Sequence, residues 1–190
     1  MSLDYAILGF LNYHPYTGYD LKKIFDDSVR HFWQADQSQI YRTLARLTEQ
    51  GLVEMEKIAQ EDRPDRKVYH ITPAGQAELL KWLAGPPPME EPRSAALIQV
   101  FFAGQLSDEE ILAKFEGFAA ICRVILARYE QVPSQIGPYR QEINSPREQF
   151  FWMLTLENGI GNVHASLEWA ESIIERIKKG QIPPKGRRKK

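Results

Sequence analysis

The sequence has a single cysteine, Cys122, among 190 residues. One thiol excludes an intramolecular disulfide and a zinc site built from several cysteines. No run approaches the roughly 20 uncharged apolar residues that a membrane-spanning helix needs. The opening segment, MSLDYAILGF, has no basic leader. We therefore expect a soluble cytoplasmic protein with no disulfide, no metal and no membrane contact.

Catalytic motifs are also missing. The four histidines, at positions 14, 31, 70 and 164, are scattered over different segments. The sequence has no HExxH pair, no glycine-rich phosphate loop and no GxSxG. Cys122 falls on the apolar stripe of its helix, which favours a buried hydrophobic role over a nucleophile. These absences predict that the protein is not an enzyme and needs no cofactor.

An excess of positive charge is absent as well. The chain has 24 Lys and Arg against 25 Asp and Glu, a net charge of -1. A protein that binds nucleic acid with this balance must do so through a local basic surface. With 43% apolar residues the chain has enough hydrophobic side chains to build a globular core.

The pattern of residues 1–85 predicts three helices, a β-hairpin and a fourth helix. The hairpin strands are separated by the polar turn QEDRPD, and Thr72 with Pro73 begins the last helix. This order is typical of a winged helix-turn-helix domain. The expected helices cover 3–12, 18–29, 37–50 and 73–84, and the expected strands cover 52–59 and 66–72.

The segment GPPPMEEP (85–92) interrupts helical structure, and we place the domain boundary there. Residues 93–180 form a second domain of three helices, at 94–103, 107–132 and 145–179, followed by a basic flexible tail, 181–190. The expected fold is mainly α, with an N-terminal winged helix-turn-helix domain and a C-terminal α-helical dimerisation domain with coiled-coil-like long helices. The tail can add a salt-sensitive attraction to phosphates.

The last helix has an apolar seam. Its apolar residues recur in steps of three and four, as in a coiled coil. Packing against 107–132 of the same chain is one explanation. A second chain is the other, because Trp152, Trp169 and Ile173 lie off the seam and need further cover. We expect contacts with a second chain at Leu156, Ile160, Val163, Leu167, Ile174 and Ile177.

Helix 37–50 has an exposed face that resembles a DNA-reading surface. If Ile40, Leu44 and Leu47 are buried, the 100° step turns polar and cationic residues outward. Gln and Arg contact base edges, and Ser and Tyr contact phosphates. The alternative is an ordinary solvated face. The candidate DNA-binding residues are Ser38, Gln39, Tyr41, Arg42 and Arg46 on this helix, with Arg63, Arg66 and Lys67 on the hairpin.

Four strings of the sequence resemble the PadR family of bacterial transcriptional regulators. They are YAILGFL (5–11), TGYDL (17–21), FWQADQSQIYRTLARLTEQGLVE (32–54) and DRKVYHITPAGQAEL (65–79). The resemblance implies a homodimeric repressor that binds double-stranded DNA at an inverted repeat. It also implies DNA contacts by Tyr41, its polar neighbours and the hairpin. Arg42 departs from the family, in which many members carry proline after the tyrosine.

Members of this family respond to phenolic acids, to planar drugs or to no identified ligand, which implies a small-molecule effector as a candidate partner. The aromatic residues that would line its site are Phe101, Phe102, Trp152 and Trp169, although aromatics at helical spacing are more often core. A different function remains open. Residues 1–85 carry 10 basic against 12 acidic side chains, which also suits a winged-helix protein-interaction module without sequence-specific DNA binding.

Overall fold

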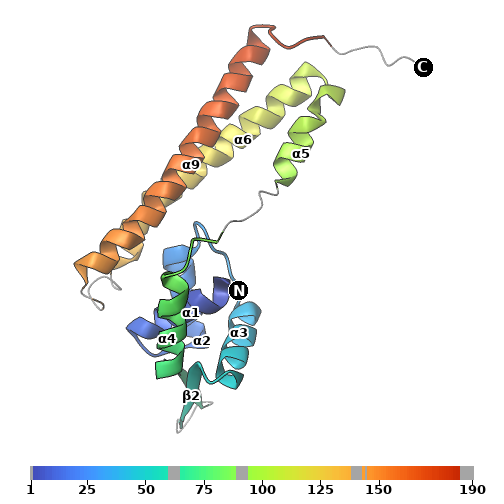
Figure 1. Cartoon of the computed structure of the whole chain (residues 1–190). Coiled ribbons are helices and arrows are strands. Elements are labelled where there is room, and N and C mark those ends of the chain that lie inside the picture. The colour runs from blue at the N-terminus through green and yellow to red at the C-terminus, as the bar shows by residue number, and fades with distance from the viewer. Residues whose placement is uncertain (1, 60–64, 89–93, 138–142, 144, 185–190) are drawn as a thin grey trace. The chain divides into compact units, whose positions relative to one another are not determined.

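The computed structural model describes residues 2–59, 65–88, 94–137, 143 and 145–184. Contacts divide the chain into two compact units, Met1–Pro88 with Ser134–Ser145, and Met89–Pro133 with Pro146–Lys190. Figure 1 shows the two units with the longer helices labelled. None of the helices in the described ranges is long and apolar enough to cross a membrane.

The first unit is built from helices and a small sheet in the order predicted for a winged helix-turn-helix fold, which is confirmed. Threonine or aspartate caps α2, α3 and α4 through Thr17, Asp36 and Thr72, because each side-chain oxygen accepts an otherwise unpaired amide of the first turn. The elements are α1 (Ser2–Tyr13), β1 (Tyr16–Thr17), α2 (Gly18–Ile24), η1 (Phe25–Val29), α3 (Gln37–Glu49), β2 (Val53–Ile58), β3 (Arg66–Ile71) and α4 (Pro73–Leu83).

The sheet has one strand more than the sequence predicted. Its order is β1-β3-β2, and both pairs are antiparallel. The two residues of β1 pair with β3 as Tyr16 with Tyr69 and Thr17 with Val68. Two residues are too few for a period-2 pattern, so this strand gave no sequence signal. The expected helix 18–29 also differs, because its second half is the π-helical stretch η1.

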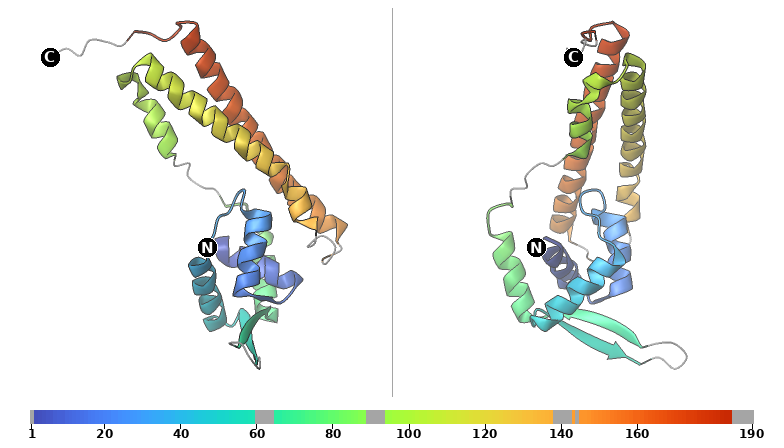
Figure 2. Two further views of the ribbon diagram at one scale, coloured as in Figure 1. Left: turned by 180° about the vertical axis from the view of Figure 1, so that it is seen from behind. Right: turned by 90° about the vertical axis from the view of Figure 1, so that its right-hand side faces the viewer.

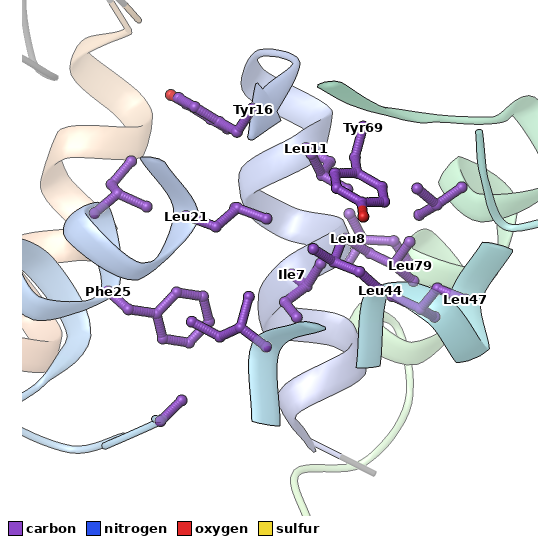
Figure 3. Close-up of a cluster of buried hydrophobic side chains, with 14 residues drawn as sticks. Ile7, Leu8, Leu11, Tyr16, Leu21, Phe25, Leu44, Leu47, Tyr69 and Leu79 are labelled. Carbon is purple, nitrogen blue, oxygen red and sulfur yellow. The ribbon is translucent and has the colours of Figure 1, made fainter. Parts of the chain in front are cut away.

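A single apolar cluster fixes α3 within the first unit (Figure 3). Leu8 of α1, Leu21 of α2 and Leu44 of α3 have no exposed surface, and Phe25 is 1% exposed. Each such side chain contributes about 1.5 to 3 kcal/mol by leaving water. The cluster therefore holds one face of α3 inside and leaves the opposite face in solvent.

Two long antiparallel helices dominate the second unit (Figure 1; Figure 2). Ser107 caps α6 in a reciprocal capping box with Glu110. Two ion pairs join α6 to α9: Arg123 to Glu171 at 2.6 Å and Lys178 to Glu116 at 2.9 Å. Its described elements are α5 (Ala95–Phe101), η2 (Ala103–Gln105), α6 (Asp108–Tyr129) and α9 (Pro146–Lys178), while the short α7 (Val132–Gln135) falls at the division between the units.

Candidate nucleic-acid interface

The solvent side of α3 carries most of the polar residues that the sequence predicted there. Ile40, Leu44 and Leu47 have no exposed surface, so the helix cannot rotate without exposing its core face. Of the predicted DNA-binding residues on this helix, four are exposed: Ser38, Gln39, Tyr41 and Arg42.

Hydrogen bonds organise the first turn of α3 around Asp36. Its Oδ1 accepts the Ser38 hydroxyl at 2.6 Å and the Gln39 backbone amide at 2.8 Å. The bond from Ser38, followed by that from Gln39, holds the pKa of Asp36 below its ordinary value, so the cap stays ionised. The Gln39 side-chain oxygen accepts the Asp36 amide at 2.9 Å. The side-chain nitrogen of Gln39 takes part in neither of these bonds, so it can donate to a ligand.

Tyr41 and Arg42 lie next to this turn. The Arg42 Nε donates to the Ser38 carbonyl at 3.3 Å, which directs the guanidinium along the exposed face. The Tyr41 ring covers Gly18 at the start of α2. A Cβ at residue 18 would lie 2.6 Å from Tyr41 Cζ, so only glycine leaves room for the ring. Gly18 was not singled out from the sequence, because this contact joins two helices.

Arg46 is placed differently from the other predicted contacts. Its Nη2 forms an ion pair with Asp4 of α1, and its side chain is 37% exposed. Residue 46 lies one turn beyond Arg42, where α3 approaches α1. The ion pair ties α3 to α1 and turns Arg46 toward α1, and its contact with DNA stays a prediction.

The hairpin adds a pair of cations. Lys67 of β3 and Lys57 of β2 are exposed and are direct cross-strand partners. Like charges placed opposite each other on a sheet are mutually unfavourable, and neither lysine has an ion pair within the described residues. A negative charge placed near both lysines would relieve their repulsion. Lys57 was missed from the sequence because only the register reveals its partner.

Arg66 lies beside this pair but has a partner of its own, since its Nη2 is 3.2 Å from Asp20 of α2. Tyr69, which the resemblance places on the same strand, is buried, and burial raises its pKa. Arg63 and residues 185–190 of the basic tail lie outside the described residues.

The predicted seam of α9 is used largely inside the chain. Leu167, Ile174 and Ile177 pack into a cluster with Phe115 and Ala119 of α6. Leu156 is buried, and Ile160 and Val163 are half-buried. The expected contact between this helix and 107–132 is therefore present. Ile160, Val163, Leu167 and Ile174 are only half-buried in the single chain, so the contact of the seam with a second chain stays a prediction.

Exposed apolar side chains gather instead on α5. This seven-residue helix has no buried residue. Ile98 is 62% exposed and Phe101 is 82% exposed, with Leu97 and Phe102 also exposed. Contiguous exposed apolar residues mark surfaces for interaction with another molecule.

The aromatic residues proposed to line a ligand site do not converge. Trp152 and Trp169 are 17 residues apart on one helix, or roughly 25 Å at 1.5 Å per residue. Trp169 packs edge-on against Phe115, with ring centroids 5.4 Å apart. These four aromatics therefore do not line one small pocket. Cys122 is buried and burial raises its pKa, which keeps the thiol neutral.

Two family models match the chain in succession. The transcriptional regulator PadR-like family matches residues 7–81, and the virulence activator alpha C-terminal family matches 92–178. A probable transcriptional regulator of Mycobacterium tuberculosis is 31% identical, over 93% of this chain and 98% of its own. The negative transcriptional regulator PadR of Bacillus subtilis is 29% identical with the same coverage.

Solved structures agree with these matches. Bacillus subtilis PadR in complex with operator DNA has a TM-score of 0.81 at 28% identity, covering 93% of this chain and 99% of that one. Its complex with p-coumaric acid has a TM-score of 0.74 at 27% identity, covering 94% and 99%. The expectation that the chain is not an enzyme agrees with the named function of both relatives. The chain belongs to the PadR-like family of transcriptional regulators.

Proposed function

We propose that the protein is a homodimeric repressor that binds an inverted-repeat operator in double-stranded DNA. One observation carries the proposal. The exposed face of α3, with Ser38, Gln39, Tyr41 and Arg42, lies in the same unit as the opposed lysines of the hairpin, which have no ion pair among the described residues. A helix that reads base edges beside a cationic wing is how winged helices bind a groove and its flanking phosphates. The relative solved with operator DNA supports the assignment.

In this proposal residues 1–85 bind DNA, residues 93–180 form the dimer, and the protein acts in the cytoplasm. The dimer covers promoter DNA and so blocks transcription. A ligand releases it by binding one dimer geometry more tightly than the other, since equal affinity for both would shift nothing. The PadR complex with p-coumaric acid supports a small phenolic acid as that ligand.

Purified protein incubated with sheared genomic DNA of its source organism at physiological salt tests this function. We expect sequencing of the retained fragments to give a few promoter regions that share an inverted repeat. We expect p-coumaric acid to release the same fragments. Retention of random fragments, or of none, would contradict a sequence-specific regulator.

Charge supports one second candidate, a winged-helix module that binds a protein. Residues 1–85 have a net charge of -2, which lowers non-specific attraction to DNA. The salt dependence of DNA affinity separates the two candidates. A protein-interaction module has no DNA affinity that falls steeply with salt.

The opposed lysines are expected to contact phosphates without reading sequence. Replacing both, as Lys57→Gln with Lys67→Gln, should weaken binding to operator and unrelated DNA alike, by about tenfold at 150 mM salt. The slope of log K against log salt should become shallower by about 1.8, at 0.9 for each phosphate contact. Fluorescence anisotropy across a salt series measures both.

Lys81→Gln is the matched control. Lys81 is equally a surface lysine, but it lies on α4 and is 3.9 Å from Glu78. It should leave the affinity and the slope unchanged. If the variant with both hairpin lysines replaced keeps the wild-type salt slope, the two lysines do not contact DNA.

A further inference from the structure

The ion pair between Arg66 and Asp20 connects the hairpin to α2. The Asp20 Oδ2 accepts the Arg66 Nη2 at 3.2 Å. The same oxygen accepts the Thr17 hydroxyl at 2.7 Å and the Thr17 backbone amide at 3.4 Å, which completes the capping box of α2. Asp20 is therefore held in place by its own helix. The guanidinium that contacts Asp20 belongs to Arg66, the first residue of β3.

Arg66 differs in this respect from its neighbours on the hairpin. Lys57 and Lys67 have no acidic partner among the described residues, whereas Arg66 already has a carboxylate. Arg66 is 52% exposed and Asp20 is 39% exposed. An ion pair this open adds little to the stability of the fold. The ion pair instead sets the orientation of the Arg66 guanidinium and limits its binding to an external anion.

A carboxylate and a DNA phosphate compete for the same groups of an arginine, because the guanidinium binds both through its N–H donors. When the phosphate of a bound duplex approaches the hairpin, Arg66 must leave Asp20 or share itself between the two. The carboxylate also places one negative charge beside the incoming phosphates. Both effects lower the affinity for DNA.

We propose that Asp20 is a positioning residue that holds Arg66 against α2 and competes with a DNA phosphate for its guanidinium. This inference rests on the proposed DNA-binding function and adds a residue that limits the affinity for DNA. Asp20 keeps part of the cationic hairpin neutralised also while a duplex is bound, because it retains the Arg66 guanidinium in competition with the phosphate. Affinity for DNA in general is thereby held down, and discrimination depends more on the contacts of α3.

Asp20→Asn removes the charge and keeps an oxygen for the Thr17 donors. We expect the variant to bind operator and unrelated DNA about threefold to tenfold more tightly at 150 mM salt. The salt slope should become steeper by about 0.9, because one more phosphate contact forms without an internal competitor. Glu54→Gln is the control for loss of one negative charge on the hairpin, since Glu54 is exposed on β2. It should give a smaller gain.

A double-mutant cycle with Arg66→Gln shows whether Asp20 acts through Arg66. In the Arg66→Gln background, Asp20→Asn should change neither the affinity nor the slope. An equal gain in both backgrounds would reduce Asp20 to a bulk charge and overturn the inference, and so would an Asp20→Asn variant with wild-type affinity. Wild-type protein without salt-dependent DNA binding would instead overturn the proposed function itself, and the inference with it.

A second pair of variants covers the case in which Asp20→Asn unfolds α2. Glu and Gln at the third helical position both complete a capping box, so Asp20→Glu and Asp20→Gln differ chiefly in charge. Asp20→Glu should keep the wild-type affinity and slope, and Asp20→Gln should show the gain. Equal behaviour of the two would contradict the proposal, since a purely structural cap does not depend on the charge.

Discussion

Replacing Leu97 and Phe101 of α5 with glutamate is expected to convert a dimer into a monomer and to weaken operator binding by about 100-fold or more. Both side chains are exposed on a helix that has no buried residue, so the single chain tolerates the charges. Between two chains, the same charges would be buried without partners. A monomer holds only one half-site and loses the gain from simultaneous binding of two.

Light scattering on a size-exclusion column measures the oligomeric state, and fluorescence anisotropy measures operator affinity. Circular dichroism should report the wild-type helix content, because neither residue is part of a core. Leu80→Glu is the matched control, since Leu80 is an equally exposed leucine on α4 of the first unit. It should stay dimeric. A doubly charged α5 variant that remains a dimer would move the interface to another surface.

Gly75→Ala is expected to destabilise the first unit by about 2 kcal/mol or more, lowering the Tm by roughly 10 °C. Gly75 is buried in the first turn of α4, where its amide is accepted by the Thr72 hydroxyl at 3.1 Å. A Cβ there would collide with the backbone oxygen of Leu52 and lie 2.8 Å from Ile71 Cγ1. A backbone oxygen cannot move away without shifting the chain between α3 and β2.

Gly9→Ala in α1 is the same chemical change, but it is expected to stabilise the first unit. Nothing lies within 4 Å of a Cβ at residue 9, and alanine is favoured over glycine inside a helix by about 1 kcal/mol. Thermal unfolding followed by circular dichroism compares the two. A Gly75→Ala variant as stable as wild type would mean that α4 packs less closely on Leu52 than the contact indicates.

Local signals decided most of what could be predicted about the first unit. Thr72 begins its helix as expected, and Thr17 and Asp36 cap theirs by the same local rule, because a cap depends on a residue and the amide three positions later. The buried stripe of Ile40 and Leu44 follows from helical periodicity. The exposed polar face of α3 was predictable for the same reason, since the outward direction is set once the inward one is known.

Contacts between residues far apart in the sequence determined the features of the first unit that could not be predicted. Periodicity placed Arg46 outward, but Asp4, 42 residues earlier in the chain, draws it against α1. Lys57 became a candidate only through its register with Lys67, because a one-residue shift would place it on the other face of the hairpin. The Asp20–Arg66 pair joins residues 46 apart. No local pattern contains such contacts.

The apolar seam of α9 shows which features depend on the amino-acid sequence alone and which depend on the tertiary structure. The sequence by itself specified that Leu167, Ile174 and Ile177 share one face and need cover, because a 3.6-residue period places them there. Only the tertiary structure decided that α6 of the same chain supplies that cover and that α5 keeps an apolar surface exposed. Hydrophobic burial is non-directional and fixes how much surface must leave water, while the identity of the partner depends on how the whole chain packs.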